Sequence, residues 1–255
     1  MQNNKNYQQS AAVVMAGGRG TRINAGDLPK VMMPVNGRPM VDYVIEAVKA
    51  SVIAKTPVVV VGYQADKVRS YLGAGVRYAL QEQQLGTGHA VGCARSILEG
   101  NAEQIIVLNG DHPTIRPGTI NRLLEQQLRE ENVITMATVV VNDFDGWRVG
   151  MANYGRVVRD QEGRFVRVVE YKDATEEQKQ IKEINPNYFC FQAKWLWEHV
   201  DQIRNNNNQK EYYLPDLLAM AVQENMPLGT TSAVPEEALG INTMEELGLI
   251  EELLK

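Results

Sequence analysis

The first half of the chain alternates short apolar segments with segments of helical spacing, and few folds accommodate that order. Three segments are almost continuously apolar and β-branched, as buried strands are: residues 11–15, 57–61 and 105–108. Four segments have the spacing of amphipathic helices: residues 39–50, 65–72, 88–98 and 115–128. The alternation predicts an α/β fold with a doubly wound, mainly parallel sheet that is covered by helices.

From residue 133 onward, strands become more frequent. We expect strands over residues 133–141, 184–191 and 229–233, and a hairpin over residues 156–160 and 165–170. Helices are expected over residues 195–203, 213–224 and 243–254. We expect the polar residues 1–10 to form a disordered tail and residues 11–255 to form one domain. That domain comprises a first half (about residues 11–132), a smaller β-rich second lobe (about 133–241) and a closing helix (242–255).

The composition excludes several classes of protein. A net charge of −5 argues against a general nucleic-acid binder, which needs a basic surface. Cys93 and Cys190 are too few and too far apart for a zinc site or a disulfide framework, and reduced thiols are typical of cytoplasmic proteins. No apolar run approaches the roughly 20 residues that span a bilayer, and residues 1–10 lack the apolar core of a signal peptide. We therefore expect a soluble cytoplasmic protein that binds neither nucleic acid nor membrane.

Residues 16–22, Ala-Gly-Gly-Arg-Gly-Thr-Arg, follow the first expected strand and combine glycines with basic side chains. Backbone N–H groups in such a loop approach phosphates closely. The loop is not a dinucleotide fingerprint, because Ile23 stands where the third glycine belongs, and the P-loop pattern occurs nowhere in the chain. The forked Arg22 and the point charge of Lys30 suit phosphate oxygens. A tight turn with solvated cations has the same spacing, but three basic side chains within residues 19–30 of an acidic protein favour phosphate binding.

Two other loops stand where this fold binds ligands, at the carboxyl ends of strands. Asp111 follows an apolar strand and a glycine, which is a usual position for a carboxylate that holds Mg²⁺, although a plain turn aspartate has the same surroundings. Gly86, Thr87 and Gly88 precede an expected helix and offer backbone groups to a base or a phosphate. Neither loop is specific on its own.

Taken together, these segments resemble the sugar-nucleotide pyrophosphorylases, a family of nucleotidyltransferases. The resemblance is strongest to the uridylyltransferase domain of the bacterial UDP-N-acetylglucosamine pyrophosphorylases, and it runs from about Ala11 to Asn242. It rests on these segments, in chain order: AGGRGTR, DLPKVM, QLGTGHA, NGDHP, YGRVVRD, VEYKDAT, EIN and NNNNQKEYYLPD. The number of segments and their order make the match specific.

The resemblance implies a role for each matching position. The backbone of Met15, Ala16, Gly17 and Gly18 would cradle the nucleotide, and the uracil base would lie against Gln81, Gly86 and Thr87. The catalytic positions are Arg22, Lys30 and Asp111, with Mg²⁺ on Asp111 and Asn242. The sugar phosphate would be held by Gly155, Glu170, Asn185 and Lys172. The first half thus becomes a Rossmann-like nucleotide half, and the second lobe becomes a sugar-binding lobe.

The implied reaction joins UTP and N-acetylglucosamine-1-phosphate to give UDP-N-acetylglucosamine and pyrophosphate. Two polyanions must meet, so positioning and charge neutralisation account for most of the catalysis, and Mg²⁺ is the expected cofactor. The sugar phosphate is already ionised at pH 7, so no general base is required. The chain has no tandem hexapeptides of the kind that build a left-handed β-helix, so we expect no acetyltransferase activity. A homo-oligomer is compatible with the sequence.

Positions that depart from the family pattern gather on the sugar side. Relatives commonly have an aromatic residue at Asn109, a smaller apolar one at His112, and Thr-Gly at Pro186 and Asn187. They also show T-G-Y-G-R where this chain has Ala-Asn-Tyr-Gly-Arg at residues 152–156. These departures leave open another sugar-1-phosphate, such as glucose-1-phosphate, or another nucleotide. A further alternative is a transferase of the molybdopterin or cytidylyl type, which the sugar-side motifs disfavour. Another is a catalytically inactive sugar-nucleotide sensor, which the presence of the catalytic positions disfavours.

Histidines and tryptophans elsewhere have simpler explanations. For His112 a structural hydrogen bond is favoured over a role beside the metal, and His89 is expected to pack or cap at the start of its helix. Trp195 and Trp197 fit a packed helix better than a stacking platform.

Overall fold

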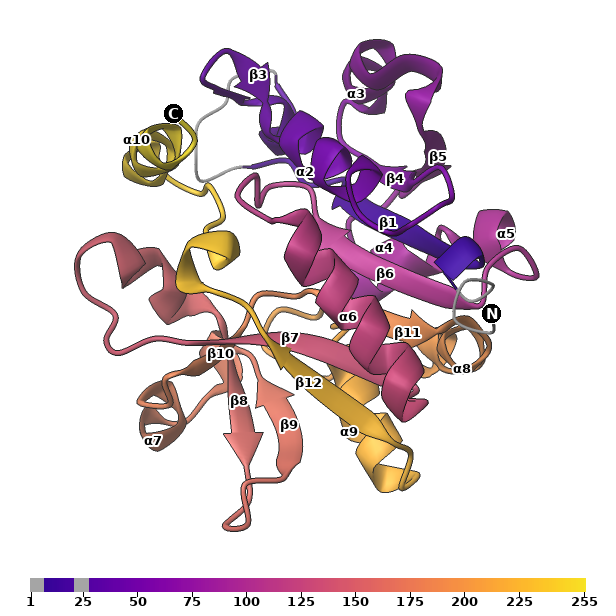
Figure 1. The fold of residues 1–255 in the computed structure, drawn as a ribbon. Helices are drawn as coiled ribbons and strands as arrows, with labels where there is room; N and C mark the ends of the chain where they lie inside the picture. Colours follow the sequence, from indigo (N-terminus) through magenta and orange to yellow (C-terminus); the bar gives the residue numbers. More distant parts are fainter. Residues whose placement is uncertain (1–6, 21–27) are drawn as a thin grey trace.

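One sheet runs through the molecule and joins its two parts (Figure 1). In the computed structural model, which describes residues 7–20 and 28–255, the strand order is β5-β4-β1-β6-β11-β7-β10-β8-β9, with β12 also paired to β7. The strands are β1 (Ser10–Ala16), β4 (Val58–Val61), β5 (Arg77–Leu80), β6 (Gln104–Asn109), β7 (Ile134–Val140), β8 (Gly155–Arg159), β9 (Phe165–Val169), β10 (Glu183–Asn185), β11 (Phe189–Gln192) and β12 (Leu228–Ser232). A separate short hairpin pairs β2 (Pro34–Val35) with β3 (Arg38–Pro39).

In the first half, β5, β4, β1 and β6 all pair in parallel. The chain leaves β1 for β4 on one side and later returns to β6 on the other, so the direction of winding reverses between β1 and β6. Ligands bind at such a switch point, beyond the carboxyl ends of the strands. Met15 and Asn109 are partners in the β1–β6 register and therefore stand on either side of it.

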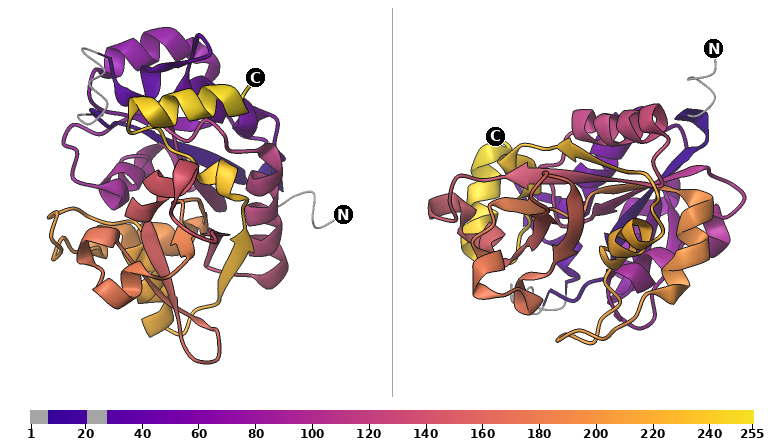
Figure 2. Two further views of the ribbon diagram at one scale, coloured as in Figure 1. Left: turned by 90° about the vertical axis from the view of Figure 1, so that its left-hand side faces the viewer. Right: turned by 90° about the horizontal axis from the view of Figure 1, so that it is seen from below.

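Helices cover both faces of the sheet, as Figure 2 shows for α6 and α9. The helices are α2 (Met40–Lys49), α3 (Ala65–Leu72), α4 (Thr87–Gly92), α5 (Arg95–Leu98), α6 (Pro117–Glu130), α7 (Glu176–Lys179), α8 (Ala193–His199), α9 (Asp216–Gln223) and α10 (Met244–Leu253). Alternate residues of β1 enter two separate cores: Ala12 and Val14 pack with α2, α3 and α6, while Ala11 and Val13 pack with α4, α5, α8 and α9. The expected doubly wound α/β fold is confirmed.

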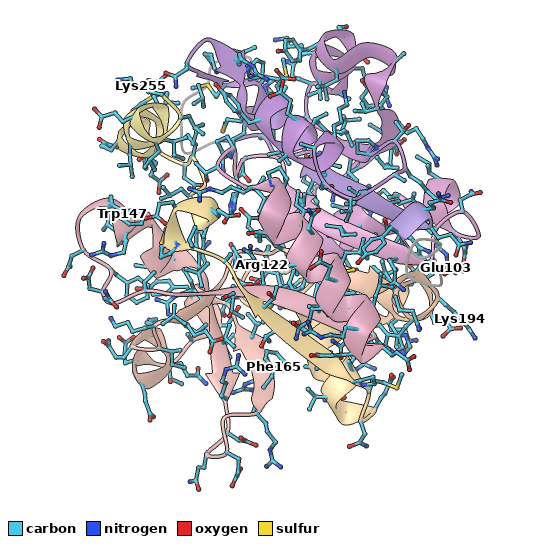
Figure 3. The ribbon with its side chains drawn as sticks, viewed as in Figure 1. Glu103, Arg122, Trp147, Phe165, Lys194 and Lys255 are labelled. Atoms are coloured by element: carbon cyan, nitrogen blue, oxygen red, sulfur yellow. The ribbon has the colours of Figure 1, made fainter. Side chains whose placement is uncertain are left out.

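The second lobe is built mainly from antiparallel pairs. The predicted hairpin is present as β8 and β9, and β10 pairs with β8 and β7. Along its other edge, β7 pairs in parallel with β12, and Arg122 of α6 reaches over to donate to the Ser232 carbonyl of β12 at 3.3 Å (Figure 3).

One predicted strand, residues 184–191, was wrong. The structure has two strands there, β10 and β11, separated by Pro186–Tyr188. Pro186 has no N–H to give to a ladder, and Asn187 has a positive φ of 61°, so the strand cannot continue through them. The Asn185 side chain closes the resulting turn by accepting a hydrogen bond from the Asn187 N–H at 2.8 Å.

Other differences concern the bounds of elements. The helix expected over residues 88–98 is divided into α4 and α5 after Gly92, a poor helix former. The helix expected from residue 213 begins at Asp216, because Pro215 occupies its N-cap position. The strand β5 was not expected, because three of its four residues are at least partly exposed at the edge of the sheet.

Both ends of the chain pack against the first half. Ser10, expected in the tail, is a buried residue of β1 whose hydroxyl donates to the Tyr7 carbonyl at 2.6 Å, and Tyr7 packs on the core. Residues 7–10 therefore belong to the fold, and residues 1–6 of the expected tail lie outside the described residues. The closing helix α10 lies beside the β2–β3 hairpin, where Glu251 accepts from the Asn36 N–H at 3.1 Å (Figures 1 and 2). Within the parts of the chain described, no helix is long and apolar enough to cross a membrane.

Candidate active site

A cavity of about 240 Å³ opens at the carboxyl ends of β1, β5 and β6. It gathers most of the residues assigned to the nucleotide and to catalysis. Its lining comprises Met15, Gly17, Gly18, Lys30, Val31, Gln81, Gln84, Gly86, Thr87, Ala90, Asn109, Asp111 and Glu211. Ala16 is buried at the end of β1, behind this lining. Arg22 lies outside the described residues.

The glycine loop is shaped by close contact with its neighbours. A Cβ on Gly17 would lie 2.8 Å from Gln81 Oε1, so only glycine lets the loop approach this side chain. The Gly17 carbonyl accepts a hydrogen bond from the Tyr63 N–H at 3.2 Å, which ties the loop to the end of β4. Gly20 has a φ of +69°, and a Cβ there would lie 2.7 Å from Cβ of Lys30. The loop therefore holds Lys30 and Gln81 close to the end of β1.

At the other end of the cavity, Gln81 is held by two partners. It is buried, and its Nε2 donates to the Gly86 carbonyl and to Nδ1 of His89, both at 3.1 Å. Thr87 Oγ1 accepts from the Leu214 N–H at 2.9 Å, so this hydroxyl fixes the loop to the start of α9. Gln81, Gly86 and Thr87 are thus brought together as expected, and His89 packs beneath them at the start of α4.

Lys30, Asp111 and Asn242 form the charged centre of the site. Lys30 Nζ donates to Asp111 Oδ2 and to Asn242 Oδ1, the second at 2.8 Å. Burial alone would raise the pKa of the Asp111 carboxyl, but the Lys30 ammonium outweighs it and lowers that pKa to about 2. Asp111 is therefore a carboxylate at pH 7. Asn242 is positioned by the Ile241 N–H, which donates to the Asp111 carbonyl at 3.3 Å, and by the capping box of α10.

The oxygens of Asp111 and Asn242 fit a hard divalent cation. Both lie within hydrogen-bond distance of one ammonium group, so they converge on the same point. Among the described residues, no three His, Cys, Asp or Glu side chains gather into a metal cluster. A pair of oxygen donors suits Mg²⁺ better than zinc, because Mg²⁺ takes few protein ligands and completes its shell with water and substrate phosphates.

Three of the four residues assigned to the sugar also lie together. Gly155 and Asn185 are partners in the β8–β10 register, and a Cβ on Gly155 would lie 3.2 Å from Glu170 Oε1. Burial of Glu170, with Asp216 and Asp173 nearby, raises the pKa of this carboxyl to about 7. A carboxyl poised near neutrality in this position can accept or donate hydrogen bonds to hydroxyl groups.

Asn185 and Lys172 are less available than the resemblance implies. The Asn185 amide donates to Asn187 Oδ1 at 2.9 Å and accepts from the Asn187 N–H, so the turn after Pro186 occupies it. Lys172 is exposed, and its Nζ donates to Gln209 Oε1 at 2.5 Å. None of the four residues assigned to the sugar lines the cavity that holds Lys30 and Asp111, and Glu170 lines a separate cavity with Asp216.

Residues 12–212 match the family model described as a MobA-like NTP transferase domain. The chain belongs to this family. Bifunctional protein GlmU of Pelobacter propionicus is 39% identical over 248 residues, which cover 96% of this chain and 52% of that protein. The proteins of the same name from Clostridium novyi and Geotalea daltonii are 37% identical over 246 residues and 40% identical over 240 residues, covering 52% and 50% of their own lengths. The chain spans about half the length of these relatives, and the resemblance drawn from its motifs is confirmed.

In this NTP transferase, residues 205–212 join the segments assigned to the base and to the sugar. The Tyr212 N–H donates to the Leu85 carbonyl at 2.8 Å on the base side. On the sugar side, Asn208 Nδ2 donates to the Lys172 carbonyl at 3.0 Å. The run of asparagines at residues 205–208 was the signal, because asparagine side chains readily bond to backbone groups.

Proposed function

We propose that this NTP transferase is a uridylyltransferase, which joins UTP and N-acetylglucosamine-1-phosphate to give UDP-N-acetylglucosamine and pyrophosphate. One observation carries the proposal: three groups of residues follow each other in the order of the strands of the sheet, at β5, at β6 and at β8 with β9. Gln81 and Gly86 form the base end, the Lys30–Asp111–Asn242 cluster forms the centre, and Gly155 lies with Glu170 in the second lobe. That order matches the base, the phosphates and the sugar of the product. The proposal concerns only the half of the relatives that the chain matches.

The chemistry follows from the charges of these residues. A phosphate oxygen of the sugar phosphate forms a bond to the α-phosphorus of UTP, the bond from that phosphorus to its β-bridging oxygen breaks, and pyrophosphate leaves with the electron pair. The Lys30 ammonium neutralises negative charge that develops on the phosphates. Mg²⁺ bound by Asp111 and Asn242 would supply further positive charge to the phosphate oxygens. No side chain needs to remove a proton, because the nucleophile is already an anion.

A different sugar-1-phosphate is the second candidate, because the Asn185 amide is occupied by Asn187. The test is pyrophosphate release with Mg²⁺ across UTP, dTTP, CTP, GTP and ATP, each with the 1-phosphates of N-acetylglucosamine, glucosamine, N-acetylgalactosamine and glucose. The proposal predicts strong turnover only with UTP and N-acetylglucosamine-1-phosphate. Turnover with UTP and glucose-1-phosphate would keep the reaction and change the sugar. Silence with every pair would support a sensor without catalysis.

A further inference from the structure

Beneath the charged centre, a buried pair formed by His112 and Tyr188 has a defined hydrogen-bond direction. The Tyr188 hydroxyl donates its only proton to the Glu237 carbonyl at 2.5 Å. The same hydroxyl lies 2.8 Å from Nδ1 of His112, so its oxygen must accept a hydrogen bond from an N–H at that nitrogen. A neutral His112 ring with its proton on Nδ1 then offers Nε2 as an acceptor.

The side chain of Asn109 lies on the Nε2 side of His112, and its contacts agree with this direction of hydrogen bonding. Its Nδ2 donates to the Pro186 carbonyl at 3.0 Å and lies 3.4 Å from Nε2 of His112. Both neighbours are acceptors, so they fix which atom of the amide is nitrogen. Within residues 7–20 and 28–255, Oδ1 of Asn109 has no hydrogen-bond partner. Asn109 also lines the cavity, between Met15 and Asp111.

We propose that Asn109 is a specificity-determining residue, whose Oδ1 accepts a hydrogen bond from a hydroxyl or amide N–H of the sugar phosphate. His112 and Tyr188 are positioning residues, which keep the Asn109 amide in the orientation that presents Oδ1 to this ligand. The proposal rests on the proposed function for its kinetic test. The sugar side is favoured because Asn109 is tied to Pro186, the neighbour of Asn185. The base end follows β5, which β4 and β1 separate from β6.

A second buried tyrosine provides a matched control. Tyr154 stacks on His112 with ring centroids 6.0 Å apart, and its hydroxyl donates to the Ala238 carbonyl at 2.6 Å. Glu237 and Ala238 belong to the same 3-10 turn (Pro235–Ala238), so the variants Tyr188→Phe and Tyr154→Phe each remove one hydroxyl from that turn. Of these two tyrosines, Tyr188 is hydrogen-bonded to His112, whereas the Tyr154 hydroxyl bonds to backbone groups of Ala238 and Gly240.

The first readout is the proton on His112. A long-range ¹H–¹⁵N spectrum should show His112 protonated on Nδ1 in the unaltered chain and in Tyr154→Phe, and shifted toward Nε2 in Tyr188→Phe. The chain has three histidines, and His112→Gln assigns the signal. An Nε2 proton in the unaltered chain would overturn the proposal. This readout needs no turnover, so it is separate from the proposed function.

The second readout is kinetic. Once the His112 proton lies on Nε2, this N–H faces the Asn109 amide nitrogen as a second donor, so only the Pro186 carbonyl still favours the orientation that presents Oδ1 to the ligand. The KM for the sugar phosphate should then rise about fivefold in Tyr188→Phe, with kcat and the KM for UTP within about twofold. Tyr154→Phe should leave both KM values within about twofold. Asn109→Leu removes the acceptor directly and should raise the same KM. This variant keeps the proposal testable if Tyr188→Phe fails to fold.

Unchanged KM values in both Tyr188→Phe and Asn109→Leu would overturn the role of Asn109. If the chain turns over no pair of substrates, the proposed function fails, and calorimetric binding of N-acetylglucosamine-1-phosphate replaces the KM in the same comparison.

Discussion

The two halves of the site are specified in different ways. In the first half, the ligand-facing loops are shaped by backbone contact: Gly17 lies against Gln81, and the Gly110 N–H donates to the Met15 carbonyl at 2.9 Å. On the side assigned to the sugar, side chains that reach distant segments set the surface: Asn109 of β6 donates to the Pro186 carbonyl, and Lys172 donates to Gln209. Backbone contacts tolerate almost no substitution, whereas side-chain networks can be exchanged. The comparison implies that the loops assigned to the nucleotide are the fixed part of this fold and that the residues assigned to the sugar are the adaptable part.

The largest effect should come from the charged centre between the two regions. Asp111→Ala removes the carboxylate that lies with Asn242 around one cation, so turnover should fall about a thousandfold. The folded state should also lose some stability, because the Lys30 side chain is only 13% exposed and keeps Asn242 alone as its partner, so circular dichroism must show that the variant is folded. Asp66→Ala is the control, since this aspartate is almost wholly exposed. A near-normal rate in Asp111→Ala would show that Asp111 neither binds the metal nor takes part in catalysis.

A methyl group in the first half should affect only the nucleotide. In Gly17→Ala the new Cβ collides with Gln81 Oε1, so the KM for UTP should rise about tenfold while the KM for the sugar phosphate stays within about twofold. Gly248→Ala provides the control, because apart from the adjoining backbone of its own helix nothing lies within 4 Å of the Cβ position at this glycine. Steady-state kinetics with each substrate varied in turn measure both values. Equal rises in the two KM values would contradict the assignment of separate substrates to the two halves.

Glu170 should make sugar binding depend on pH. Its pKa is raised to about 7, so the carboxyl is mostly protonated at pH 6 and mostly ionised at pH 8. A carboxylate accepts hydrogen bonds from sugar hydroxyls more strongly than a neutral acid, so the KM for the sugar phosphate should fall about fivefold over that interval. In Glu170→Gln this dependence should disappear, and the KM at pH 8 should be raised. Since both proteins use the same substrate, a parallel pH profile in the variant would assign the dependence to the substrate instead.

The smallest effect should come from Lys172. Its ammonium group is exposed and bound to Gln209, so Lys172→Ala should raise the KM for the sugar phosphate only about twofold. Gln209→Ala is the matching variant, which removes the partner and leaves the charge. A loss of tenfold or more in Lys172→Ala alone would show that the lysine reaches the phosphate when substrates bind.

The same division explains what could be predicted from sequence. The predicted strands over residues 11–15, 57–61 and 105–108 lie within a residue of the bounds of β1, β4 and β6, because buried parallel strands are continuously apolar. The predicted helix over residues 65–72 has the bounds of α3. Edge strand β5 was missed because its residues are mostly exposed. The break between β10 and β11 could be predicted from Pro186. The hydrogen bond of the Asn185 amide within the resulting turn could not, because it depends on the positive φ and the side chain of Asn187.

Partners distant in sequence could not be predicted. Nothing in the residues around His112 reveals that Tyr188 lies 2.8 Å away, or that the 205–209 loop lies over Lys172. Such pairs are chosen by the packing of whole elements. Glycines, in contrast, mark close approach of the backbone directly in the sequence.

The central claim is that one edge of the sheet holds a sugar phosphate in position to attack UTP. The most direct test uses N-acetylglucosamine-1-phosphate labelled with ¹⁸O in its phosphate group and follows the label by mass spectrometry. Attack of this phosphate on the α-phosphorus predicts that all of the label enters UDP-N-acetylglucosamine and none enters pyrophosphate. Label in pyrophosphate, or release of pyrophosphate from UTP without the sugar phosphate, would contradict the account.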